Sequence, residues 1–313
     1  MENTTLRSDI FGLRKILAAF VKFSRPHTVI GTSMSVVSLY FIAWANVVPA
    51  EFHVSGLMIA LMSCLGANIY IVGLNQITDI DIDRINKPDL PLAAGDFSPR
   101  TGRVIILVAL AISILLAISQ GKFLAFTVIF SLLIGTAYSL PPVRLKRFHF
   151  WAAACIFTIR GLIVNIFLFL HFQFLMTGSE KIPPKIWALT LFMFGLSLVI
   201  AWFKDIPDMM GDRQFQIITL TIKLGARKVF NIGLGLLSFC YLGLIAAGIA
   251  GLPGVNAAVL VVSHLILFAI LLQVARTIDP LKKRQISRFY LFTWILFYAE
   301  YIFYAAACLL AIP

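Results

Sequence analysis

Charged residues are scarce in this sequence of 313 residues. Only 13% of the residues are charged, whereas 60% are hydrophobic, and the mean hydropathy is +0.94. A soluble domain needs a largely polar surface, so this composition excludes one. The alternation of polar and apolar residues that marks the strands of a membrane β-barrel is lacking as well. The sequence therefore predicts an all-α, polytopic membrane protein.

Cysteines are few, and each stands alone. They occur within separate apolar runs, with no CxxC pair and no spacing typical of a metal site: Cys64, Cys155, Cys240 and Cys308. Such an arrangement excludes a disulfide framework and a cysteine metal centre, and we interpret these residues as small core side chains.

Long apolar runs, in contrast, recur along the whole chain. A hydrocarbon core about 30 Å thick is crossed by about 20 apolar residues of a helix. We expect nine spans, at about residues 27–47, 54–76, 104–119, 123–140, 150–171, 186–203, 229–250, 255–275 and 289–311. Residues 1–25 mix basic with apolar side chains, so we assign them to an interfacial segment without a cleaved targeting signal. Residues 26–313 then form a single integral-membrane domain.

Basic residues give the chain a net charge of +12. Binding to nucleic acid could explain such an excess, but the distribution decides against it. If nine helices cross the membrane, nearly all basic loops fall on one face, and the other face keeps only Lys122, Lys181 and Lys185. The positive-inside rule places the N-terminus and the basic loops in the cytoplasm. We predict no nucleic-acid ligand and no obligate protein partner.

Two groups of acidic residues stand at the ends of apolar runs on this same face. Asn75, Asp79 and Asp83 are four residues apart, so on a helix they form one stripe of oxygen ligands, away from Asp81. The second group, Asp205, Asp208 and Asp212, follows the sixth apolar run, and Asp208 and Asp212 repeat the four-residue step. Solvation alone does not require a four-residue step twice. We interpret the stripes as facing walls of one pocket.

Facing acidic stripes suit magnesium, which proteins hold through one or two carboxylates together with phosphate oxygens of the substrate. A diphosphate bound in this way becomes a better leaving group, because its developing charge is stabilised. The expected metal ligands are Asn75, Asp79, Asp83, Asp205, Asp208 and Asp212. The expected diphosphate ligands are Asn75, Arg25, Arg84, Lys87, Arg144 and Lys146. The candidate catalytic residues are Asp79, Asp83, Asp208, Asp212 and Lys146.

Simpler interpretations stay open at this point. The acids could be helix-end carboxylates paired with loop Lys and Arg, and Arg144 and Lys146 could serve membrane topology alone. Arg25 and Arg160 could reach the interface or cap carbonyls. A lipid transporter is the competing class of protein, although acids at mid-depth would then be expected.

These residues resemble the motifs of the UbiA superfamily of intramembrane prenyltransferases. Its Asn-Asp-x-x-Asp-x-x-x-Asp motif matches Asn75, Asp79 and Asp83, and its Asp-x-x-x-Asp motif matches Asp208 and Asp212. The family's tyrosine-to-lysine element falls on Tyr138 through Lys146. The resemblance implies a nine-helix bundle with two magnesium ions that bridge a prenyl diphosphate. It extends over nearly the whole chain.

Within the superfamily, the phrases FSRPHTVIGT and KDIPDMMGDRQFQIITLTIKLG look most like the branch that prenylates homogentisate. Gln76 stands where the general motif has an acidic residue, and Leu90 stands where many members of the superfamily have an arginine. Both departures are shared with the homogentisate branch. The resemblance implies phytyl transfer from its diphosphate to homogentisate with decarboxylation, in a cyanobacterial thylakoid or plasma membrane. Solanesyl or geranylgeranyl transfer to homogentisate and chlorophyll synthesis are the alternatives within the family.

Overall fold

The computed structural model describes residues 14–47 and 52–311. Apart from one isolated β-bridge between Phe148 and Ile218, the regular structure of these residues is helical. The elements are α2 (Pro26–Trp44), α3 (Val54–Thr78), α4 (Ile80–Asn86), α5 (Pro91–Ala94), α6 (Pro99–Ser119), α7 (Lys122–Ser139), η1 (Leu145–Arg147), α8 (His149–Phe157), η2 (Thr158–Leu168), α9 (Phe169–Thr177), α10 (Pro184–Asp205), α11 (Met209–Gln214), α12 (Leu220–Leu224), α13 (Ala226–Ile249), α14 (Ala257–Arg276) and α15 (Lys283–Leu309).

Nine helical segments of the described ranges are long and apolar enough to cross a membrane, which confirms the predicted number of spans. The fifth, His149–Thr177, combines α8, η2 and α9, and its middle part is a π-helix that the apolar pattern did not reveal. The third and ninth spans begin at Pro99 and Lys283, before their apolar runs, because each helix includes polar residues that precede its apolar segment. The chain is an integral membrane protein.

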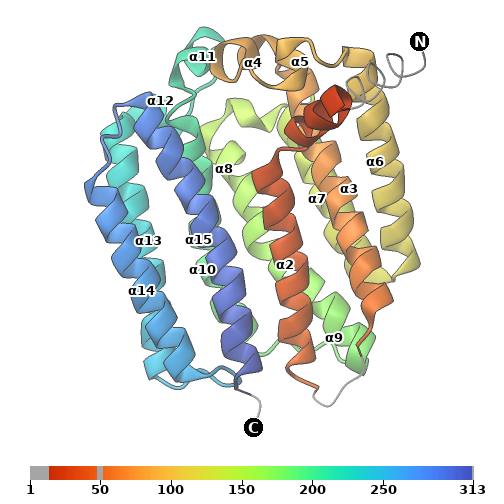
Figure 1. Cartoon of the computed structure of the whole chain (residues 1–313), viewed down its shortest axis with the longest axis vertical. Helices are drawn as coiled ribbons and strands as arrows, with labels where there is room; N and C mark the ends of the chain where they lie inside the picture. Colours follow the sequence, from red (N-terminus) through yellow and green to blue (C-terminus); the bar gives the residue numbers. More distant parts are fainter. Residues whose placement is uncertain (1–13, 48–51, 312–313) are drawn as a thin grey trace, which may run out of the picture.

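The long helices form one bundle, and several short helices lie across one of its ends (Figure 1). α4, α5 and α11 are at this end, directly after α3 and α10, so both acidic groups lie there together. Of the predicted interfacial segment, residues 14–23 are helical and residues 1–13 lie outside the described part. Its contact with a lipid surface stays a prediction, as does the side of the membrane that this end faces.

Small residues allow the helices to approach closely in the bundle. A Cβ added to Gly66 of α3 would lie 2.9 Å from the carbonyl oxygen of Ala109 in α6. The same two helices share a hydrogen bond that Ser63 Oγ donates to the Ser113 carbonyl at 2.7 Å. Such small-residue contacts are the usual means of helix association in lipid, where apolar burial against neighbours gives little advantage.

A polar pair is fully buried on the other side of the bundle. His264 of α14 and Glu300 of α15 have no exposed surface, and their Nε2 and Oε2 atoms are 3.0 Å apart. His264 Nδ1 lies 2.7 Å from the Leu260 carbonyl oxygen. Because both ring nitrogens face oxygen acceptors, both are placed to donate a hydrogen bond. The pair therefore joins α14 to α15 through a network with satisfied histidine nitrogens.

Candidate active site

The first acidic stripe lies on two helices instead of one. α3 ends at Thr78, and Asp79 has φ −122° and ψ 17° before α4 begins at Ile80. The four-residue relation survives this break, because the Asp83 amide still donates to the Asp79 carbonyl at 2.7 Å. Asn75 Nδ2 donates to Asp79 Oδ2 at 2.9 Å. The expectation of one continuous helix was wrong, but the three side chains remain on one side.

The second acidic stripe is built in the same way. α10 ends at Asp205, and Pro207, which has no N–H to continue the helix, stands in the following turn. Asp208 precedes α11, and the Asp212 amide donates to the Asp208 carbonyl at 3.1 Å. In both stripes, one aspartate stands immediately before a short helix and the next lies four residues further on. A short helix thus presents each acidic pair.

The two short helices touch each other. The Gly211 amide of α11 donates to Asn86 Oδ1 of α4 at 3.1 Å, and a Cβ added to Gly211 would lie 2.5 Å from that oxygen. Glycine is therefore required at this close approach. Asn86 was not predicted as a site residue, although it follows Asp83 by three residues and so lies on the same helix face. This contact brings the acidic stripes to one place.

One aspartate of each stripe is neutralised by a lysine. Lys146 is buried, and its Nζ lies 2.5 Å from Asp79 Oδ1, while Lys87 forms an ion pair with Asp208. Asp83 and Asp212, the second aspartates, form no ion pair within the described ranges. Within the described ranges, Asp79, Asp205 and Asp208 are thus paired with basic side chains, as helix-end carboxylates would be, whereas Asp83 and Asp212 are not.

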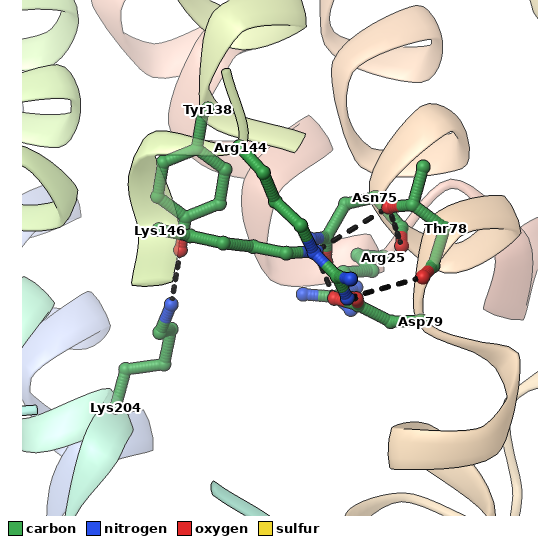
Figure 2. A network of polar contacts seen from close by, with 8 residues as sticks. All are labelled: Arg25, Asn75, Thr78, Asp79, Tyr138, Arg144, Lys146 and Lys204. Atoms are coloured by element: carbon green, nitrogen blue, oxygen red, sulfur yellow. Dashed lines mark hydrogen bonds and ion pairs between the residues drawn. The ribbon is translucent and has the colours of Figure 1, made fainter. Parts of the chain in front are cut away.

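Further cations surround Asp79 and Asn75 (Figure 2). Arg144 Nη2 lies 3.0 Å from Asp79 Oδ1, on the same oxygen that Lys146 contacts. Arg25 Nη2 donates to Asn75 Oδ1 at 3.3 Å. Tyr138 from the family's tyrosine-to-lysine element accepts a hydrogen bond from Lys204 Nζ at 2.8 Å. The loop after α7 therefore brings its basic residues against the end of α3.

These side chains surround a polar pocket of about 50 Å³, which we call the acidic pocket. Nine predicted site residues line it: Arg25, Asn75, Asp79, Asp83, Lys87, Lys146, Asp205, Asp208 and Asp212. Arg144 reaches it through Asp79. Arg84 does not, since its exposed guanidinium pairs with Asp81 at 2.8 Å. The structure adds Tyr138, Lys204 and Asn86, which were not among the predicted ligands.

The acidic pocket adjoins a larger cavity of about 190 Å³ inside the bundle, which we call the apolar cavity. Four residues line both: Arg25, Asn75, Tyr138 and Lys204. Most of the other lining side chains belong to α2, α3, α7, η2, α10 and α15, and the walls include Ile71, Val128, Ile159 and Phe297. One molecule with a charged end and an apolar end can therefore occupy both spaces.

Burial changes the protonation of the pocket. It raises the pKa of Asp83 to about 6, although Arg25 and Lys87 act against it. Burial and the nearby Asp205 and Asp208 carboxylates raise the pKa of Asp212 to about 7. In the opposite direction, burial lowers the pKa of Lys146 to about 8, with Asp79 opposing. The two unpaired aspartates thus titrate close to neutral pH.

Magnesium fits this set of residues. The described residues contain no group of three His, Cys, Asp or Glu side chains that could alone hold a metal ion. Magnesium does not need such a group, because one or two carboxylates with substrate phosphate oxygens and water suffice. Asp83 Oδ2 is buried without a hydrogen-bond partner, so a hard oxygen ligand is available beside the other acids. We therefore retain the carboxylates as candidate ligands.

The fold and the paired acidic motifs define a class of intramembrane enzyme. A family model described as the UbiA prenyltransferase family matches residues 33–296, so the chain belongs to the UbiA prenyltransferase family. Over 294 residues the chain is 47% identical to homogentisate phytyltransferase from Synechocystis sp., with coverage of 93% of this chain and 96% of the relative.

A plant relative and a solved structure agree with this assignment. Homogentisate phytyltransferase 1, chloroplastic, from Arabidopsis thaliana is 43% identical over 298 residues, which cover 92% of this chain and 75% of the relative. The fold is similar to that of a UbiA homologue from Archaeoglobus fulgidus bound to GPP and Mg2+. The TM-score is 0.68 at 17% identity, with coverage of 93% of this chain and 99% of the other.

Proposed function

We infer that this chain transfers a phytyl group from phytyl diphosphate to homogentisate with loss of carbon dioxide, giving 2-methyl-6-phytylbenzoquinol in tocopherol biosynthesis. One observation carries this inference: the doubled acidic motif lines a polar pocket that adjoins an apolar cavity. A diphosphate with a long hydrocarbon chain fits such a combined space. The identity to homogentisate phytyltransferases over almost the full chain supports the choice of donor and acceptor.

The acidic pocket is the proposed magnesium site. Asn75, Asp79, Asp83, Asp208 and Asp212, with Asp205 beside them, would hold two ions against the donor diphosphate. Bound magnesium would neutralise the diphosphate and so make it a better leaving group. The magnesium in the Archaeoglobus fulgidus homologue supports the choice of metal.

Basic side chains of the pocket are proposed to bind the diphosphate oxygens. Lys146 and Arg144 approach from the loop after α7, Lys87 from the end of α4, and Arg25 from the residue before α2. Their positive charge stabilises the negative charge that develops on the leaving group. Arg84 has no such role in this proposal, because its guanidinium faces Asp81 at the surface.

The reaction then exchanges bonds without any further reactant. The bond from the allylic carbon to the diphosphate oxygen breaks, and that carbon bonds to an electron-rich carbon of the homogentisate ring. The ring carbon loses its proton. The bond to the carboxyl carbon breaks as carbon dioxide leaves, and the methylene carbon keeps the electron pair and takes up one proton. The walls of the apolar cavity exclude water, which would otherwise capture the allylic cation.

We place the acidic pocket at the cytoplasmic end of the bundle, in a cyanobacterial thylakoid or plasma membrane. The basic loops next to the pocket support this orientation. The proposed partners are the two substrates and membrane lipid, with neither nucleic acid nor an obligate protein partner.

An assay of the purified protein tests the function. Detergent-solubilised protein with magnesium, phytyl diphosphate and carboxyl-labelled homogentisate should release pyrophosphate and labelled carbon dioxide in equal amounts, and EDTA should stop both. Solanesyl and geranylgeranyl diphosphates and chlorophyllide serve as competing substrates. Label retained in a prenylated product, or a preference for chlorophyllide, would contradict the homogentisate assignment. A lipid transporter would release no pyrophosphate from the diphosphate.

A further inference from the structure

Arg160 is a charged residue in the middle of a membrane span, and the acidic pocket does not include it. It lies in η2 and lines the apolar cavity. Among the described residues its guanidinium makes no hydrogen bond and no ion pair, and it lies over the Trp294 ring, with Cζ 4.8 Å from the ring centre. A charge within a membrane is energetically costly, and such residues usually pair with an opposite charge or bind a ligand. We therefore expect an anion to bind here.

The backbone around Arg160 is held in place by polar side chains. Asn165 Nδ2 donates to the Arg160 carbonyl at 2.9 Å and to the Gly161 carbonyl at 3.0 Å. Tyr301 of α15 in turn donates to Asn165 Oδ1 at 2.7 Å. These bonds occupy carbonyls of the π-helix and fix it to α15. π-helical turns are frequent at functional sites.

The guanidinium is also oriented through Trp294. The His27 ring packs edge-on against the Trp294 ring, with their centres 5.0 Å apart. A Cβ on Gly31 would lie 2.8 Å from Trp294 Cζ3, so the indole has little room to move. A guanidinium over an indole keeps its N–H groups at its edge available for hydrogen bonds. That edge matches the two oxygens of a carboxylate.

The donor diphosphate has other cations at its proposed site. Lys146, Lys87 and Arg144 lie at or beside the acidic pocket. Arg160, in contrast, follows His149 by eleven residues, which places it roughly 15 Å along the helix from the start of the span. The prenyl chain is apolar and gains nothing from a guanidinium. The carboxylate of the acceptor is the anion that remains.

We propose that Arg160 binds the carboxylate of the aromatic acceptor inside the apolar cavity. This assignment rests on the proposed function, in which homogentisate is the acceptor. Arg160 would hold the ring by its acetate group, so that a ring carbon faces the allylic carbon beside the acidic pocket. Departure of the carboxylate as carbon dioxide removes this anchor, and the prenylated ring is then free to leave. Arg160 is a specificity residue for acceptors that carry a carboxylate.

The test compares Arg160→Gln and Arg160→Lys with the wild type in steady-state kinetics. The KM for homogentisate should rise roughly 10- to 100-fold in Arg160→Gln, as expected for loss of hydrogen bonds between charged groups. The KM for phytyl diphosphate should stay within about twofold. Arg160→Lys should recover part of the loss, because it keeps the charge but not the two-pronged geometry. Arg276→Gln, the same change at the exposed end of α14, is the control and should behave as the wild type.

A second measurement has a wild-type arm that does not depend on how the variants fold. Homogentisate methyl ester should compete with homogentisate roughly tenfold more weakly in the wild type than a carboxylate analogue of the same size does, and this difference should vanish in Arg160→Gln. Equal competition in the wild type, or a changed KM for the diphosphate donor alone, would overturn the proposal. A wild type that prenylates only acceptors without a carboxylate would refute both proposals. Wild-type kinetics of Arg160→Gln would refute this one and leave the proposed function intact.

Discussion

Lys87, at the end of α4, forms an ion pair with Asp208, which stands immediately before α11. Lys87, which follows the first acidic stripe in sequence, thereby neutralises one aspartate of the second stripe. Asn86, the neighbour of Lys87 in sequence, accepts a hydrogen bond from the Gly211 amide where the same two helices meet. The acidic pocket thus depends on the approach of two segments more than 100 residues apart in the chain.

Removal of a carboxylate from the pocket should abolish most turnover. Asp79→Asn, Asp83→Asn, Asp208→Asn and Asp212→Asn should each lower kcat by more than about 100-fold, because a neutral amide is a poor ligand for a hard cation. Asp205→Asn should be milder, because Asp205 lies outside the four-residue pair of Asp208 and Asp212, and Pro207 interrupts the helix between Asp205 and that pair. Pyrophosphate release by purified variants measures the effect. Near-normal rates in both Asp79→Asn and Asp208→Asn would eliminate the two-stripe metal site.

The contact between α4 and α11 should be intolerant of one methyl group. Gly211→Ala would place Cβ 2.5 Å from Asn86 Oδ1, so the Asn86 side chain must shift and its contact with α11 is lost, and we expect the acidic pairs to be displaced. A displacement of about 1 Å can lower turnover by about 100-fold. Gly243→Ala is the matched control, because nothing lies within 4 Å of its added Cβ. If both variants turned over equally well, the contact would have no part in assembling the pocket.

Lys146 should act on the donor and not on the acceptor. Lys146→Ala should lower kcat/KM for phytyl diphosphate by roughly 100-fold, the usual effect of removing one donor to a developing oxyanion. Arg144→Ala should have a smaller effect, because Lys146 lines the acidic pocket whereas Arg144 reaches it only through Asp79. Kinetics against each substrate separately decide this. Unchanged donor parameters in both variants would leave these residues with a role in topology alone.

The pocket should require a narrow range of pH. Magnesium binds ionised carboxylates, and the raised pKa values of Asp83, about 6, and Asp212, about 7, mean that protons compete with the metal as the pH falls below about 7. The apparent affinity for magnesium should therefore weaken toward acid. On the alkaline side, Lys146, with its pKa lowered to about 8, loses its charge, so the KM for the donor should rise. Magnesium titrations of turnover across this range would show a flat profile if the acids do not hold the metal.

The buried pair between α14 and α15 should contribute to stability and not to catalysis. His264→Leu leaves the Glu300 carboxylate buried without its partner, which typically costs about 3–5 kcal/mol. His171→Leu is the control, because His171 is also buried but its Nε2 has no hydrogen-bond partner within the described residues. Thermal unfolding in detergent should show a large loss for the first variant only. Equal losses would mean that packing around each ring dominates.

Several features of the fold and site could be predicted from the sequence. Nine apolar runs gave nine spans, because a bilayer imposes one helix length. The acidic stripes could be predicted because carboxylates at the ends of apolar runs are unusual, and a four-residue step places them on one face of a helix.

Other features depend on contacts between distant segments and left no local pattern. The break at Asp79 occurs without proline or glycine, and the contact of Asn86 with Gly211 joins two separate loops. Arg84 has the charge expected of a ligand, but its direction follows from Asp81 beside it. Arg160 was interpreted as reaching the interface or capping carbonyls, whereas its guanidinium lies over Trp294 at the apolar cavity. The π-helix could not be predicted, because the predominantly apolar sequence of this span does not distinguish it from an α-helix.

The wall shared by the acidic pocket and the apolar cavity has a thermodynamic consequence. Both spaces are bordered by Arg25, Asn75, Tyr138 and Lys204. The intact donor can occupy both spaces because its diphosphate end and its hydrocarbon end are bonded to each other. Once they separate, pyrophosphate is soluble only in water and the prenylated ring only in lipid. For the reverse reaction, both would have to return at once from different phases. Partition between water and bilayer, together with the loss of carbon dioxide, thus opposes the reverse reaction.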